Sequence, residues 1–219
     1  MDSHTRDVPE KSRYTPKEEL ANSLTHGIGT ALAIAGLTVL VVLAANKGDA
    51  WRVVGFSVYG ATLVMLYLAS TLYHAVSKPE FKTFFRILDH GAIFLLIAGS
   101  YTPLTLVTLR GPWGWTLFGL IWGVAVIGLV TTILFLNAPR WFVSLLYIGM
   151  GWMAVIAIKP LIDALPLGGM LLLGAGGLAY TGGVVFYIWE KLPYNHAVWH
   201  LFVLAGSIFH YLLMAFYVL

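Results

Sequence analysis

The sequence predicts an all-α integral membrane protein, built as a bundle of seven transmembrane helices. Of its 219 residues, 59% are hydrophobic and only 11% are charged, which leaves too few polar groups to coat a water-soluble globule. Apolar stretches of roughly 20 residues, the length that crosses a hydrocarbon core of about 30 Å, recur along the chain. They lack the alternation of apolar and polar residues that marks the strands of a membrane barrel, so each stretch is expected to be a helix.

The spans are separated by short segments rich in turn-forming residues. We place them near residues 24–45, 52–75, 88–108, 113–136, 141–162, 167–189 and 196–218. Because the connections are short, successive helices should run antiparallel in one domain, residues 21–219, after a polar tail, residues 1–20. The tail lacks the apolar core of a cleavable signal peptide, so the first span should be retained. Pro103 is expected to kink the third span, and the glycine-rich sixth span to pack closely on a neighbour.

Basic residues predict the orientation of the bundle. One side of the predicted membrane carries nine of them: Arg6, Lys11, Arg13, Lys17, Lys78, Lys82, Arg86, Arg140 and Lys191. The other side carries four: Lys47, Arg52, Arg110 and Lys159. Because Lys and Arg accumulate on the cytoplasmic side, the N-terminus is expected in the cytoplasm and the C-terminus outside.

The composition also limits the possible partners and cofactors. The formal net charge is +3 and the basic residues form no patch typical of nucleic-acid binding, so no nucleic-acid partner is expected. The chain has no cysteine, which excludes disulfides and thiolate ligands. A bound metal would therefore need histidine, carboxylate or hydroxyl ligands.

Histidines gather at the predicted cytoplasmic ends of the spans, where ionisable side chains usually serve a purpose. His196 and His200 are four residues apart at the start of the seventh span, so both imidazoles point toward one place. Ser70 and His74 have the same spacing at the end of the second span, and Asp89 opens the third. The antiparallel order brings all of these groups to the same depth.

We expect His74, His196 and His200 to bind zinc. Three imidazoles that leave a fourth position for water are typical of a catalytic zinc site, whereas structural sites use four protein ligands. Asp89 is placed to hold or deprotonate that water and Ser70 to orient it. The alternative for histidines such as His26, His90 and His210 is an interfacial anchor or a helix-to-helix hydrogen bond, and His210 lies about 15 Å beyond His200, too far to share an ion.

The same residues resemble the hemolysin III family of bacterial membrane proteins, which is grouped with the progestin and adiponectin receptors in a superfamily of membrane hydrolases. The matching motifs are Glu19-x-x-Asn22-x-x-x-His26, Ser70-x-x-x-His74, Asp89-His90 and His196-x-x-x-His200. The resemblance covers the chain from about residue 18 onward. It implies a bacterial inner (plasma) membrane location, and zinc held by His74, His196 and His200 with Asp89 and Ser70 around its water.

The resemblance also implies hydrolysis of a lipid amide or ester, because adiponectin receptors have been linked to ceramide hydrolysis, or a role in membrane-lipid homeostasis. A membrane lipid is therefore the expected substrate or ligand, and the sequence leaves the protein partners open. Glu19, Asn22 and His26 share one helical face, and with His90 are either polar caps or contacts to the zinc ligands and substrate.

Two other functions are compatible with these residues. The first is a receptor or regulator in which zinc is purely structural. The second is a pore-forming cytolysin, which the family name suggests. A permanent pore needs a polar stripe along a helix, and the outer halves of the spans show almost none, so the pore ranks lower.

Overall fold

The computed structural model describes residues 14–219, and Arg6, Lys11 and Arg13 of the orientation argument lie outside this range. All secondary-structure elements of the described chain are helices, without strands, which confirms the predicted fold class. Its elements in order are α1 (Pro16–Asn46), α2 (Ala50–Ala75), α3 (Pro79–Pro103), η1 (Leu104–Thr108), α4 (Pro112–Leu134), α5 (Arg140–Gly151), η2 (Trp152–Ala157), α6 (Ile158–Ala164), α7 (Leu167–Ile188), α8 (Asn195–Leu213) and η3 (Met214–Val218). These elements make seven helical spans long and apolar enough to cross a membrane.

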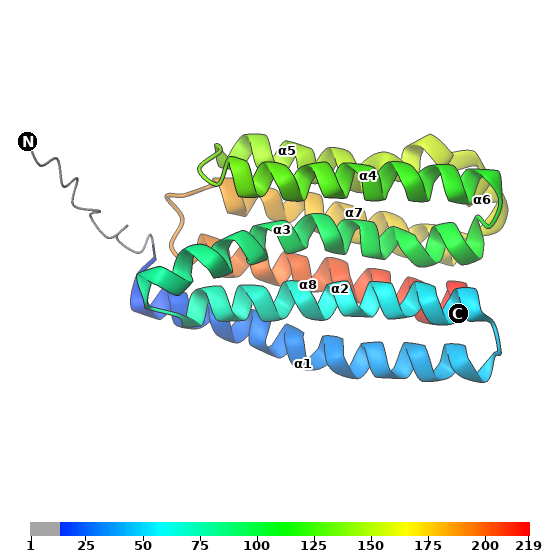
Figure 1. Ribbon diagram of the computed structural model, residues 1–219, viewed down its shortest axis with the longest axis horizontal. Coiled ribbons are helices and arrows are strands. Elements are labelled where there is room, and N and C mark those ends of the chain that lie inside the picture. The colour runs from blue at the N-terminus through cyan, green and yellow to red at the C-terminus, as the bar shows by residue number, and fades with distance from the viewer. Residues whose placement is uncertain (1–13) are drawn as a thin grey trace, which may run out of the picture.

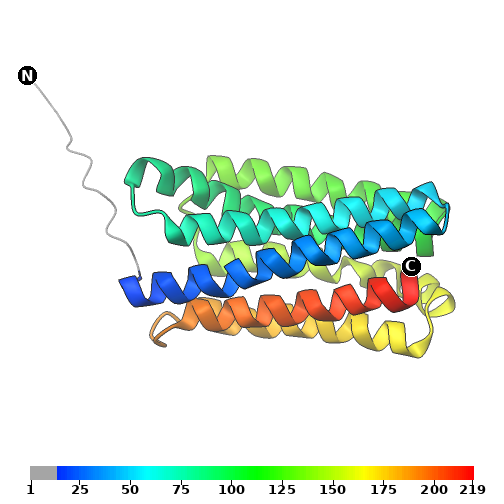
Figure 2. The same ribbon diagram turned by 90° about the horizontal axis from the view of Figure 1, so that it is seen from below.

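The spans lie side by side along one long axis, and the described chain begins at one end of the bundle and finishes at the other (Figure 1). Consecutive helices pack together as α1 on α2, α2 on α3, α3 on α4 and α7 on α8. The first and last helices, α1 and α8, are also neighbours (Figure 2). This contact brings the start of α1 beside the start of α8, and we call that end of the bundle the histidine end.

Two helices begin well before their apolar stretches. The spans expected near residues 24 and 88 start at Pro16 and Pro79. The start of α1 is determined by a capping box, in which Thr15 and Glu18 satisfy each other's backbone amides, and by Pro16 in the first turn. The polar first turns extend α1 beyond its apolar part, so polar side chains of this helix reach the histidine end.

Pro103 changes the type of helix. The α-helical part of α3 ends at this residue, and the five residues Leu104–Thr108 continue as a π-helical turn. Proline cannot donate the backbone hydrogen bond that would continue an α-helix, which accounts for the change.

Glycines allow the closest helix contacts, as expected for the sixth span. A Cβ atom on Gly176 of α7 would lie 2.2 Å from Cδ2 of His210 on α8. A Cβ atom on Gly99 of α3 would lie 2.0 Å from Oγ1 of Thr62 on α2. These positions accept no larger residue without a shift of the neighbouring side chain.

Candidate metal centre

Three buried histidines meet at the histidine end of the bundle. His74 comes from the last turn of α2, and His196 and His200 come from the first turns of α8. One ring nitrogen of each lies within 4.8 Å of the others, and the Nε2 atoms of His74 and His196 are 3.1 Å apart. The end of the second span and the start of the seventh, which were predicted from the sequence to lie at one depth, therefore do meet.

Glu19 of α1 orients His74. Its Oε2 accepts a hydrogen bond from His74 Nδ1 at 2.6 Å, and its Oε1 accepts one from Lys82 Nζ at 2.8 Å. Because a carboxylate can only accept, we assign the ring proton of His74 to Nδ1. The Nε2 lone pair of His74 then points toward the other two histidines, which is the orientation a metal ligand needs.

His200 is oriented in the same way by α1. Its Nδ1 lies 3.0 Å from Thr25 Oγ1 and 3.2 Å from the Asn22 carbonyl oxygen. The Thr25 hydroxyl already donates to backbone carbonyls of its own helix, so it accepts from His200. Nε2 of His200 is buried and has no hydrogen-bond partner among residues 14–219.

The third histidine, His196, faces a tyrosine. The hydroxyl of Tyr14 lies 3.1 Å from His196 Nδ1 and accepts a hydrogen bond of 2.8 Å from Arg140. Nε2 of His196 carries a lone pair if its Nδ1 donates to Tyr14, and carries the ring proton if the Tyr14 hydroxyl donates to Nδ1. The 3.1 Å between Nε2 of His74 and Nε2 of His196 accommodates either one hydrogen bond between the two rings or two ligands of one cation.

The donor set fits a zinc ion. Tetrahedral zinc with Zn–N bonds of about 2.0–2.1 Å places its ligand nitrogens roughly 3.4 Å apart, which is compatible with the three imidazoles found here. Within the described chain, no fourth histidine or carboxylate joins this group. Three neutral nitrogens without a fourth protein ligand match the open type of site.

Ser70 and Asp89 lie beside the three histidines. Both side chains are buried, and the Asp89 carboxyl lies close to the Ser70 side chain and to His74. Ser70 Oγ nevertheless makes no hydrogen bond of ordinary geometry with the rest of residues 14–219. A free hydroxyl and a buried carboxylate are thus available next to the histidines.

The two further histidines of the motifs have different surroundings. The ring of His26 stacks on that of His200, with centroids 3.4 Å apart and planes 12° apart. Neither of its ring nitrogens has a hydrogen-bond partner in the described chain. His90 follows Asp89 on α3, and its backbone carbonyl accepts a hydrogen bond of 2.9 Å from Tyr147 of α5.

The chain matches the family described as haemolysin-III related over residues 14–211. It belongs to this family. It is 51% identical over 203 residues to Hemolysin-3 of Bacillus cereus, which covers 93% of each chain. It is 44% identical over 204 residues to the Hemolysin-3 homolog of Bacillus subtilis, covering 93% of this chain and 96% of the relative. The human monocyte to macrophage differentiation factor is 31% identical over 212 residues, covering 93% and 87%.

In this haemolysin-III-related protein, three contacts around the histidines were not predicted from the sequence: two to histidines, from Thr25 and Tyr14, and one from Lys82 to Glu19. Thr25 lies on the α1 face of Asn22, so helical spacing could have indicated it. Lys82 reaches Glu19 only because α3 begins earlier than its apolar stretch. Tyr14 precedes the first helix, and no local pattern marks it.

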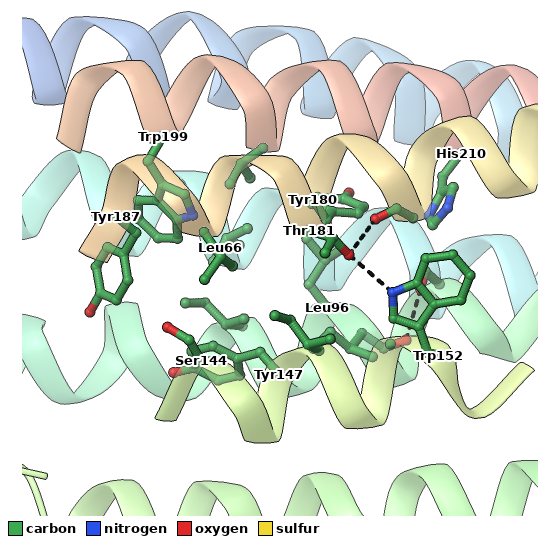
Figure 3. A pocket seen from close by; sticks show the side chains of 18 of the residues that line it. Leu66, Leu96, Ser144, Tyr147, Trp152, Tyr180, Thr181, Tyr187, Trp199 and His210 are labelled. Carbon is green, nitrogen blue, oxygen red and sulfur yellow. Dashed lines mark hydrogen bonds between the residues drawn. The ribbon is translucent and has the colours of Figure 1, made fainter. Parts of the chain in front are cut away.

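An apolar cavity begins beside the histidines and runs along the bundle toward its opposite end (Figure 3). It measures about 960 Å³ including its opening, and α3, α5, α7 and α8 supply most of its walls. His26 and Asp89 line it near the histidines, and Trp152 and His210 line it near the other end. The structure thus places a long apolar space next to the candidate metal site.

Proposed function

We propose that this haemolysin-III-related protein is a zinc-dependent membrane hydrolase that cleaves an amide or ester bond of a membrane lipid. The observation that supports it is the convergence of three buried imidazoles on one space, next to a buried carboxylate and at the start of an apolar cavity. Each part has a separate role in hydrolysis: metal binding, proton transfer and recognition of the lipid chain.

His74, His196 and His200 would hold the metal. Zinc supplies Lewis acidity, which lowers the pKa of a coordinated water to about 7 and polarises a carbonyl group. The chain contributes the orientation of the ligands, because Glu19 and the Asn22–Thr25 turn hold the Nδ1 side of His74 and His200. Partners of this kind maintain the tautomer and raise the basicity of the ligand.

Proton transfer would fall to Asp89. Its carboxylate takes a proton from the attacking water and returns it to the amine or alcohol that leaves. The Ser70 hydroxyl, which lies near this carboxylate, donates a hydrogen bond to the water or to the substrate carbonyl oxygen. His26, with both ring nitrogens free of partners in residues 14–219, offers a further polar contact to the lipid head group.

We infer that the histidine end faces the cytoplasm of a bacterial cell and that the protein resides in the plasma membrane. The described basic residues at this end include Lys17, Lys82, Arg86, Arg140 and Lys191, and an excess of such residues is typical of cytoplasmic ends. The reaction would then take place at the inner leaflet. A contribution to membrane-lipid homeostasis, as an enzyme or as a lipid sensor, follows from the same site.

The test is cleavage of a panel of lipid amides and esters by the purified protein in nanodiscs, followed by mass spectrometry. Zinc-loaded wild-type protein should release free acyl chains, and chelator treatment should abolish release. Asp89→Asn should retain zinc but lose turnover, whereas Asp163→Asn, which changes an exposed carboxylate at the opposite end, should retain both.

Two results would support other functions. If no lipid is cleaved while chelation removes bound metal and lowers the melting temperature, the metal is structural. If the protein releases dye from liposomes equally before and after His200→Ala, the chain is a metal-independent pore.

A further inference from the structure

The apolar cavity has a second polar group at the end far from the metal centre. Between the ends its walls are mainly aliphatic: Leu66, Ile93, Leu96, Ile97, Ile148, Val184 and Val203. The far end contains the imidazole of His210 beside Trp152 and Thr181 (Figure 3). An apolar space with polar groups at both ends suits a ligand with two separated polar groups.

The ring of His210 is held in place by α7. It lies against Gly176, where a Cβ atom would come within 2.4 Å of its Nε2, and its edge faces the ring of Tyr180 at a centroid distance of 5.4 Å. The Leu173 carbonyl lies close to the imidazole. Since a carbonyl can only accept, we assign the ring proton to the nitrogen that faces it, which leaves Nε2 as an acceptor.

The other nitrogen, Nε2, is a buried acceptor without a hydrogen-bond partner in residues 14–219. Neighbouring hydroxyl groups are already paired: Tyr180 with Ser207 at 2.9 Å, and Thr181 with both Trp152 and the Gly177 carbonyl. A buried acceptor left unpaired is unfavourable. A ligand that brings an O–H group to this point would therefore bind more tightly than one with a plain hydrocarbon chain.

The position of His210 sets the distance between the two polar groups of the ligand. It follows His200 by ten residues on α8, about 15 Å along the helix at 1.5 Å per residue. An extended hydrocarbon chain covers this distance with about a dozen carbons, at roughly 1.25 Å per carbon for C–C bonds of about 1.5 Å.

We propose that the cavity selects a hydroxylated acyl chain, with the hydroxyl about twelve carbons from the carbonyl group and hydrogen-bonded to His210 Nε2. The inference rests on the proposed function, in which the cavity holds the acyl chain of the lipid. It concerns binding, so it is testable without turnover.

The experiment compares the affinities of 12-hydroxystearic acid, 6-hydroxystearic acid and stearic acid for the purified protein in nanodiscs by isothermal titration calorimetry. Wild type should bind 12-hydroxystearate about fivefold more tightly than stearate, the factor that corresponds to one net hydrogen bond of ~1 kcal/mol. The 6-hydroxy isomer should bind more weakly than stearate, because its hydroxyl would lie against aliphatic walls.

The matched variant is His210→Phe, which retains a ring of similar size and removes the acceptor. It should bind stearate as the wild type does and lose the preference for 12-hydroxystearate. Equal wild-type affinities for 12-hydroxystearate and stearate would overturn the proposal. That result would mean that a water, and not the ligand, pairs with Nε2. A preference that survives in His210→Phe would also overturn it. If that variant does not fold, the order of the wild-type affinities for the three acids tests the proposal by itself. If the wild type shows this expected order of affinities but cleaves no lipid, only the proposed function is refuted.

Discussion

Replacing Glu19 with glutamine should weaken metal binding without removing a ligand. Glu19 accepts one hydrogen bond from His74 Nδ1 at 2.6 Å and another from Lys82 Nζ at 2.8 Å, through different oxygens. Glutamine has a single acceptor oxygen, so it can serve only one of these donors, and its NH2 group must face the other. The substitution also removes the negative charge that increases the basicity of His74.

The expected loss of zinc affinity follows from the role of Glu19, which contacts a metal-binding histidine and not the metal. Loss of a carboxylate that orients a metal-binding histidine typically costs 10–100-fold in affinity. Because glutamine retains one acceptor, we expect the lower end, about a tenfold weaker zinc affinity, or ~1.4 kcal/mol. The measurement is competitive titration of purified protein with a chromophoric zinc chelator at constant pH.

The matched control is Glu80→Gln, which removes an exposed carboxylate from the first turn of α3 at the same end of the bundle. It should leave zinc affinity within twofold of the wild type, because exposed charges are screened. Equal losses in the two variants would mean that only net charge matters. No loss in Glu19→Gln would show that His74 needs no carboxylate partner for zinc binding.

Two further substitutions test the packing and the unexpected contacts. Tyr14→Phe removes the hydroxyl that faces His196 Nδ1 and should lower zinc affinity about threefold in the same titration, less than Glu19→Gln because no charge is lost; an unchanged affinity would exclude a role for Tyr14. Gly99→Ala places a Cβ atom 2.0 Å from Thr62 Oγ1 and should destabilise the bundle by about 1–3 kcal/mol. Its readout is the thermal unfolding midpoint in detergent. Gly119→Ala, where nothing lies within 4 Å, is the control, and equal midpoints for the two variants would contradict the packing argument.

The seven spans were predictable because each consists of an apolar stretch of membrane length, and the structure confirms their number. Their starting points were not, since α1 and α3 begin in polar sequence. A capping box and a proline determine the start of α1. Neither feature is apolar, so a search for apolar stretches does not detect them. The error in the predicted helix bounds is largest at the histidine end, where polar helical turns surround the candidate site.

The three-histidine cluster was predictable for a related reason. The i, i+4 spacing of His196 and His200 gives them a common direction, and antiparallel spans bring the end of α2 to the same depth. Tyr14 and Lys82 could not be found in this way, because their contacts depend on which helices are neighbours. The packing of α1 against α8 is a tertiary feature that no local pattern in the sequence encodes.

That packing also explains why the early start of α1 matters for the site. Glu18 belongs to the capping box through Oε2, while its Oε1 accepts a hydrogen bond of 3.0 Å from the backbone N–H of Tyr194. Tyr194 has a φ of 56°, an uncommon conformation for a residue other than glycine. It precedes α8, so Glu18 connects the first turn of α1 to the turn that begins the helix of His196. A shift of α8 along its axis would displace both zinc-ligand candidates of that helix and His210 together, so the contact at Glu18 helps to determine the position of both polar ends of the cavity.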